Sequence, residues 1–130
     1  LVAKRGIADK FHFPGFMRGK QVQEMLAMSD VYIMPSVSEP FGISPLEAMQ
    51  VGCPSIISHQ SGCAEILQHA IKTDYWDIDA MADAIYAIVK YPAMYKSLHE
   101  LGMAEVNNIK WSDAGLKVRR IYDGVINHTL

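Results

Sequence analysis

The chain has 130 residues, of which 50% are hydrophobic and 20% are charged, and its formal net charge is −2. This length suits a single domain, residues 1–130, that buries roughly 68% of its unfolded surface. The Lys and Arg residues are scattered, which excludes the basic patch of a nucleic-acid-binding protein. No apolar run approaches the ~20 residues of a transmembrane helix, and a secretory signal is missing, so we expect a cytoplasmic protein without a transmembrane segment.

Short runs typical of buried strands alternate with helical patterns in the first half of the chain. The runs are Phe11 to Phe13, Val31 to Met34 and Ser55 to Ile57. A helical pattern separates the first two runs, and a second helix ends at Gly52 before Pro54 admits the third strand. This alternation predicts βαβ units, in which helices cover a parallel sheet.

The second half of the chain is expected to be mainly helical. A helix begins near Gly62 to Glu65, and an extended piece around Ala70 to Thr73 precedes a helix that Asp77 caps. Two more helices follow Pro92 and the pair Ser112–Asp113, and they form a helical C-terminal tail. The predicted fold class is therefore α/β, a Rossmann-like parallel sheet flanked by helices.

The segment Ser38 to Met49, SEPFGISPLEAM, joins the central strand to the following helix. Ser44, Pro45 and Glu47 fit the N-cap, first and third positions of a capping box. The start of such a helix presents free N–H groups and the positive end of the helix dipole, a combination that attracts phosphate. Gly42, just before it, lets a ligand approach the backbone closely.

Two carboxylates flank this loop. Ligands of open parallel sheets bind beyond the carboxyl ends of the strands, where the loops Pro35 to Ile43 and Ser58 to Gly62 lie. Glu39 in the first loop and Glu47 one turn inside the helix are placed to accept hydrogen bonds from paired hydroxyls, which contribute roughly 1.5–3 kcal/mol each. The residues favour a ribose or hexose that carries phosphate. Two structural alternatives stay open: Glu47 closes only the capping box, and Glu39 is a solvent-facing loop residue.

The cysteines do not form a metal-binding or disulfide pattern. Cys53 and Cys63 lie ten positions apart, without a CxxC or Cys/His grouping. We expect two buried, reduced thiols and no metal site. Tyr75, Trp76 and Trp111 are expected to anchor the packing of the core.

The ordered motifs of this chain resemble those of the retaining nucleotide-sugar glycosyltransferases of the GT-B fold, glycosyltransferase family 4, also described as glycosyl transferases group 1. They are PS, EPFG, LEAM and G-x-P, at Pro35–Ser36, Glu39–Gly42, Leu46–Met49 and Gly52–Pro54. The set extends to Phe13–Pro14–Gly15, Ser29–Asp30, Ser58, Gly62 and Glu65. The resemblance implies that the chain is a fragment, the truncated C-terminal, donor-binding domain of such an enzyme.

The resemblance also implies a role for each matching residue. Glu39 resembles the catalytic glutamate that contacts the hydroxyls of the transferred sugar. Glu47 resembles the glutamate that holds the ribose hydroxyls of the donor. The backbone that meets the donor sugar and the distal phosphate corresponds to Phe41, Gly42, Ile43 and Ser44, and the nucleotide base is expected near Gly15, Phe16 and Met17.

The implied function is transfer of a hexose from a nucleotide diphosphate sugar to an acceptor hydroxyl, with retention and without a cofactor or essential metal. Lys4 and Arg5 do not match the Arg and Lys that clamp the diphosphate in the family, and the family's acceptor-binding domain is not matched either. We therefore expect the fragment alone to be inactive and its exposed apolar surface to self-associate. A non-catalytic nucleotide-binding module and a nucleotide-sugar epimerase of the same fold remain as alternatives.

Overall fold

The structure, a computed structural model, describes residues 1–127 and contains a parallel sheet with the strand order β1-β2-β3. The strands are β1 (Tyr32–Met34), β2 (Ser55–Ser58) and β3 (Ile71–Thr73). Tyr32 lies beside Ser55, and Ser58 lies beside Thr73. All four residues of β2 are buried, as expected for a central strand of a parallel sheet that is covered on both faces.

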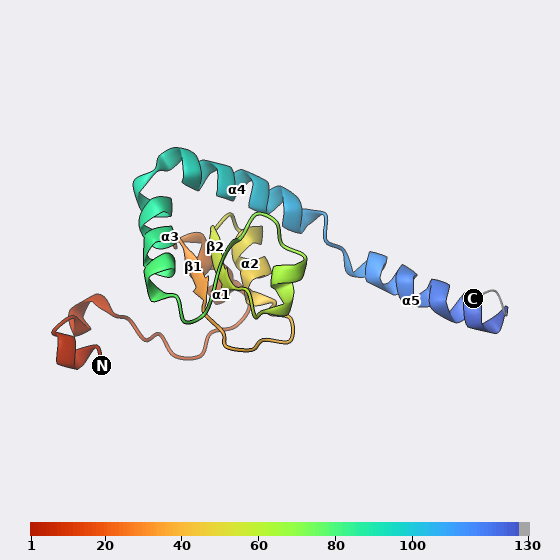
Figure 1. Cartoon of the computed structure of the whole chain (residues 1–130), viewed down its shortest axis with the longest axis horizontal. Coiled ribbons are helices and arrows are strands. Elements are labelled where there is room, and N and C mark those ends of the chain that lie inside the picture. The colour runs from red at the N-terminus through yellow and green to blue at the C-terminus, as the bar shows by residue number, and fades with distance from the viewer. Residues whose placement is uncertain (128–130) are drawn as a thin grey trace.

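Helices surround this sheet. The α-helices are α1 (Lys20–Ala27), α2 (Ser44–Gln50), α3 (Ile78–Lys90), α4 (Pro92–Asn107) and α5 (Trp111–Ile126), and the short 3-10 helices are η1 (Ala3–Arg5), η2 (Ala8–Lys10) and η3 (Gly62–Glu65). α2 contacts β1, β2, α1 and α4, whereas α3 contacts β2, β3 and α4. Figure 1 shows that α5 and the segment before α1 extend from this body in opposite directions. No helix within residues 1–127 combines the length and the apolar character needed to cross a membrane.

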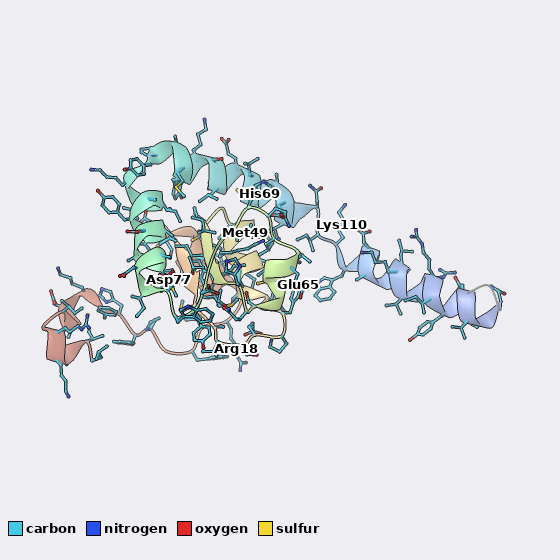
Figure 2. All side chains as sticks on the ribbon, in the orientation of Figure 1. Arg18, Met49, Glu65, His69, Asp77 and Lys110 are labelled. Carbon is cyan, nitrogen blue, oxygen red and sulfur yellow. The ribbon has the colours of Figure 1, made fainter. Side chains whose placement is uncertain are left out.

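The main hydrophobic cluster joins the sheet to α2, η3 and α4. Met49 of α2, which lies at the centre of the body in Figure 2, packs with Ile57 of β2 and with Leu67. Val106 closes the cluster from α4. A second cluster, of Leu26, Ala48 and Cys53, attaches α1 to α2. The short helix α2 therefore contributes buried residues to both clusters.

The predicted fold class is confirmed, including the parallel sheet and the helical C-terminal tail. Asp77 caps α3 as predicted, because its carboxylate accepts a hydrogen bond of 2.9 Å from the backbone N–H of Ala80. The strand predicted at Phe11 to Phe13 is wrong, because these residues form an exposed irregular segment. An apolar run becomes a strand only where a neighbouring strand pairs with it, and none of the described strands does.

The predicted capping box is also wrong. α2 begins at Ser44 itself, whose side chain makes no capping hydrogen bond. Instead, the hydroxyl of Tyr32 donates to Ser44 Oγ over 2.8 Å, and Ser44 Oγ lies 3.9 Å from Met34 Sδ. Competition from two side chains of β1 therefore turns the Ser44 hydroxyl inward. Within residues 1–127, the carboxylate of Glu47 then has no hydrogen-bond or ion-pair partner.

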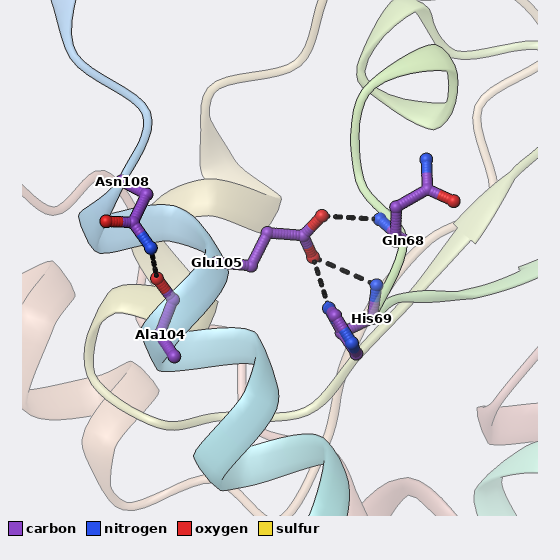
Figure 3. Close-up of polar contacts among 5 residues, drawn as sticks. All are labelled: Gln68, His69, Ala104, Glu105 and Asn108. Carbon is purple, nitrogen blue, oxygen red and sulfur yellow. Dashed lines mark hydrogen bonds and ion pairs between the residues drawn. The ribbon is translucent and has the colours of Figure 1, made fainter.

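A single carboxylate connects α4 to the turn before β3 (Figure 3). Glu105 accepts hydrogen bonds from the backbone N–H groups of Gln68, at 2.7 Å, and His69, at 2.9 Å. Its second contact with His69 is to the ring nitrogen Nδ1, at 3.1 Å. The Glu105 side chain is only 13% exposed, so it replaces water as the acceptor for both backbone groups.

Candidate functional site

The loops that follow β1 and β2 form one hydrogen-bonded unit at the carboxyl edge of the sheet. The N–H of Gly62 donates to the carbonyl of Glu39 over 2.9 Å, and the N–H of Cys63 donates to the carbonyl of Phe41 over 2.7 Å. Earlier in the loop, Ser58 Oγ donates to the carbonyl of Ser36 over 2.6 Å. The parallel sheet brings these segments together because both strands end at the same edge.

Two glycines permit this close approach. A Cβ at Gly62 would lie 2.1 Å from the carbonyl oxygen of Pro40. Gly42 has a φ of +87°, and a Cβ there would lie 2.8 Å from Met34 Cε and 3.2 Å from Glu39 Cγ. Gly42 is buried, and the absence of a Cβ there makes room for the side chains of Met34 and Glu39.

The two predicted glutamates differ in their surroundings. Glu39 is half-buried, and its aliphatic part lies against Gly42. Glu47 is exposed on α2. Within residues 1–127, neither carboxylate has an ion-pair partner, so both remain available to accept hydrogen bonds from a ligand.

A groove of about 610 Å³ runs between α2 and the junction of α4 with α5. Its lining comprises Phe41, Ile43, Leu46, Glu47, Gln50, Val106, Ile109, Lys110, Trp111 and Ala114. This volume falls within the range of ~300–1,000 Å³ that is usual for small-molecule sites. The lining is mainly apolar, with polar groups from Glu47 and Gln50 on one wall and from Lys110 on the other. Figure 2 shows Lys110 at the point where the chain leaves the body.

Only some of the predicted site residues line this groove. Phe41, Ile43 and Glu47 do, whereas Glu39, Gly42 and Ser44 do not. Gln50, Lys110 and Trp111 were not predicted as site residues. Gln50 follows Glu47 by three positions, a helical spacing that places both on one face. Trp111 was predicted to anchor packing but is 80% exposed, and no local signal in the sequence connects it to Glu47.

The predicted base-binding residues lie on the exposed segment before α1. Gly15, Phe16 and Met17 are not part of the groove lining. Phe16 is 82% exposed, and the guanidinium of Arg18 lies 4.9 Å from the centre of its ring. This cation–π contact joins two exposed side chains of the segment to each other.

The prediction of two buried, reduced thiols is confirmed, because Cys53 and Cys63 are both buried and unpaired by disulfides. Burial, reinforced by the negative charge of Asp30, raises the pKa of the Cys53 thiol to about 11. Cys53 therefore stays protonated at neutral pH and is a poor nucleophile. Among residues 1–127, no three His, Cys, Asp or Glu side chains gather closely enough to hold a metal ion.

The raised pKa of Cys53 predicts a loss of stability in alkaline solution. The folded state keeps this proton between pH 9 and about pH 11, whereas the unfolded chain releases it near pH 9. The contribution of this group to the free energy of unfolding is therefore fully present below pH 9. It falls by about 2–3 kcal/mol as the pH rises to 11. The free energy of unfolding, measured in urea at several pH values from 9 to 11, should fall less steeply with pH for Cys53→Ala than for the wild type. Equal slopes for the two proteins would contradict the prediction, because they share all other titrating groups.

Comparisons with known proteins agree on one family. The family described as "Glycosyl transferases group 1" matches residues 1–104, so its match ends within α4. N-acetyl-alpha-D-glucosaminyl L-malate synthase of Bacillus anthracis is 34% identical over 104 residues, which cover 77% of this chain and 26% of that protein. Mannosylfructose-phosphate synthase of Agrobacterium fabrum is 22% identical over 127 residues, which cover 95% of this chain and 28% of that protein.

A solved structure supports the GT-B relationship expected from the motifs. Sucrose-phosphate synthase from Thermosynechococcus elongatus superposes with a TM-score of 0.83 and 25% sequence identity. The superposition covers 98% of this chain and 33% of that one. The chain thus spans between roughly a quarter and a third of the length of these relatives.

Proposed function

Because the chain belongs to the glycosyl transferases group 1 family, we propose that it forms the donor-binding part of a retaining glycosyltransferase. In the reaction, the bond between C1 of a hexose and the diphosphate breaks, and the nucleoside diphosphate leaves with the electron pair. The acceptor oxygen forms the new bond to C1, and the proton of the acceptor hydroxyl passes to an oxygen of the departing diphosphate. No cofactor or essential metal takes part. The observation that carries this proposal is the family match over residues 1–104.

In this proposal, each predicted site residue has a part in binding the donor. Glu47 holds the ribose hydroxyls, which its exposure at the wall of the groove supports. Glu39 contacts the hydroxyls of the transferred sugar and acts as the catalytic residue. Backbone groups from Phe41 to Ser44 meet the sugar and the distal phosphate, and Gly15 to Met17 lie near the base. The start of α2 carries the positive end of the helix dipole, which favours the negative charge of the diphosphate.

The groups that bind the acceptor, and the Arg and Lys side chains that clamp the diphosphate, are not among the site residues named above. In this proposal they belong to further parts of an intact enzyme, so the 130-residue chain alone does not catalyse transfer. Catalysis depends on preorganised groups on both walls of a site, which supports this view. The proposed compartment is the cytoplasm, which the free thiols support. Self-association of the isolated chain would cover exposed apolar side chains such as Trp111 and Ile121.

Substitution of Glu47 tests nucleotide binding. Glu47→Gln should weaken the binding of UDP, GDP or ADP, whichever the wild type binds, by about tenfold, because a neutral amide loses a charge-assisted hydrogen bond. Titration calorimetry measures this change directly. Glu100→Gln is the matched control, since Glu100 lies on α4 in an exposed pair with Lys96 and does not line the groove. Equal affinity in wild type and Glu47→Gln would remove Glu47 from the site.

Substitution of Glu39 tests the catalytic assignment in the intact protein. Glu39→Ala should lower transfer from nucleotide-linked hexoses by at least about tenfold, because it removes a charged partner of the reacting sugar. Unchanged transfer in both Glu39→Ala and Glu47→Ala would refute the proposal. Product analysis separates the alternatives: an epimerase returns a different nucleotide sugar or free sugar without a glycosylated acceptor, and a binding module returns the donor unchanged.

A further inference from the structure

The loop that carries Glu39 is held by the end of β2 and by the segment that follows it. Three hydrogen bonds cross between them: Ser58 Oγ to the carbonyl of Ser36, the N–H of Gly62 to the carbonyl of Glu39, and the N–H of Cys63 to the carbonyl of Phe41. They are spaced along the loop before, at and after Glu39. Glu39 and Ser61 also pair as an isolated parallel bridge. The position of the Glu39 backbone is therefore set from β2.

Only one of these three bonds uses a side chain. The bonds from Gly62 and Cys63 come from backbone N–H groups, which a side-chain substitution leaves in place. The bond from Ser58 is the shortest, at 2.6 Å, and its serine has no exposed surface. A buried hydroxyl must be desolvated, and a hydrogen bond to a fixed carbonyl offsets that cost.

The base of the Glu39 side chain lies close to Gly42. Its Cγ lies 3.2 Å from the site that a Cβ on Gly42 would occupy, and the Glu39 residue is half-buried. A carboxylate on a flexible loop loses rotational freedom when it binds a ligand. Here the loop backbone is held by three hydrogen bonds, so part of the entropy of ordering the loop has been lost before a ligand arrives.

We propose that Ser58 is a positioning residue for Glu39, which it orients through the carbonyl of Ser36. This inference rests on the proposed function, since it assumes that Glu39 faces the transferred sugar. Without the Ser58 hydroxyl, the start of the loop loses its attachment to β2, and the carboxylate of Glu39 departs from its productive position. Misplacement of a catalytic group by about 1 Å lowers the rate strongly while ligand binding through other groups persists.

Ser61 provides a matched control. It is also a buried serine of the same segment, and its Oγ donates to the carbonyl of Ser58 over 2.7 Å. Its side chain makes no hydrogen bond to the loop before α2 among the described residues. Ser61→Ala and Ser58→Ala therefore remove the same buried group at a similar cost in stability, but only Ser58→Ala releases the Glu39 loop.

The test uses the intact protein and a panel of UDP-, GDP- and ADP-linked hexoses, with hydrolysis of the donor by water as the readout of chemistry. Ser58→Ala should lower kcat by about tenfold with KM within about twofold of the wild type, whereas Ser61→Ala should leave both within about twofold. Affinity for the nucleoside diphosphate, measured by calorimetry, should be unchanged in both variants. Assays are run well below the melting temperatures of all three proteins.

Each other outcome counts against a specific statement. Equal kcat values for the two serine variants, or a rise of KM without a fall of kcat, would overturn the role of Ser58 and leave the proposed function standing. A wild-type protein that neither binds nucleoside diphosphates nor cleaves any donor of the panel would overturn the proposed function and the role of Ser58 together.

Discussion

The Gly62→Ala substitution is expected to lower the free energy of unfolding by about 3 kcal/mol, the upper part of the usual range for overpacking. The new Cβ would lie 2.1 Å from the oxygen and 2.9 Å from the carbon of the Pro40 carbonyl, and 3.1 Å from Phe41 Cα. All three atoms belong to the backbone, so no side-chain rotation relieves the overlap. The loop before α2 must move away, which breaks the hydrogen bonds of Gly62 with Glu39 and of Cys63 with Phe41.

Urea unfolding of the wild type and two glycine variants measures this effect. Gly115→Ala is the control, because a Cβ at Gly115 meets no atom within 4 Å. Gly115 lies inside α5, where alanine favours the helix by up to ~1 kcal/mol over glycine. The unfolding midpoint should therefore fall for Gly62→Ala only. A Gly62→Ala protein as stable as the wild type would show that the two loops are not in close contact.

The Glu105→Ala substitution is expected to cost about 3 kcal/mol, because it leaves the backbone N–H groups of Gln68 and His69 without their charged acceptor. Glu105→Gln should cost about half as much, since the amide oxygen still accepts one hydrogen bond while the amide nitrogen faces a second donor. The ranking wild type, Glu105→Gln, Glu105→Ala follows from the geometry in Figure 3.

Thermal and urea unfolding of the Glu105 series provide the measurement. Glu100→Ala on the same helix is the control, because its pair with Lys96 is long, at 3.8 Å, and exposed, and such pairs contribute about 0–1 kcal/mol. If all three glutamate substitutions had the same small effect, the contact between α4 and the turn before β3 would contribute nothing to stability.

Local sequence patterns predicted the fold well wherever the residues that make the decisive contact are close together in the sequence. Asp77 and Ala80 are three positions apart, so the cap of α3 follows from the adjacent residues. The capping box at Ser44 failed because its competitor, Tyr32, is twelve positions away on a different element. The strand predicted at Phe11 to Phe13 failed for a related reason: strand formation depends on a partner, which a single segment does not reveal.

In the candidate site, too, residues near the motifs were predicted and residues distant from them in the sequence were not. The ordered motifs indicated the family, and three of the predicted residues, Phe41, Ile43 and Glu47, line the groove. The opposite wall, with Lys110 and Trp111, comes from a part of the chain that only the packing of α4 on α2 brings near. The hydrogen bond from Ser58 to Ser36 was equally hidden, because it depends on how two parallel strands end.

The outward course of α5 has a thermodynamic consequence. None of its sixteen residues is buried, so the helix depends on its own backbone hydrogen bonds and on local pairs such as Arg119 with Asp123. Isolated helices of about this length are only marginally stable in water. α5 can therefore unfold without exposing the hydrophobic core, and the groove then loses the wall that Trp111 and Ala114 form. On heating, the groove is expected to be lost at a lower temperature than the sheet unfolds.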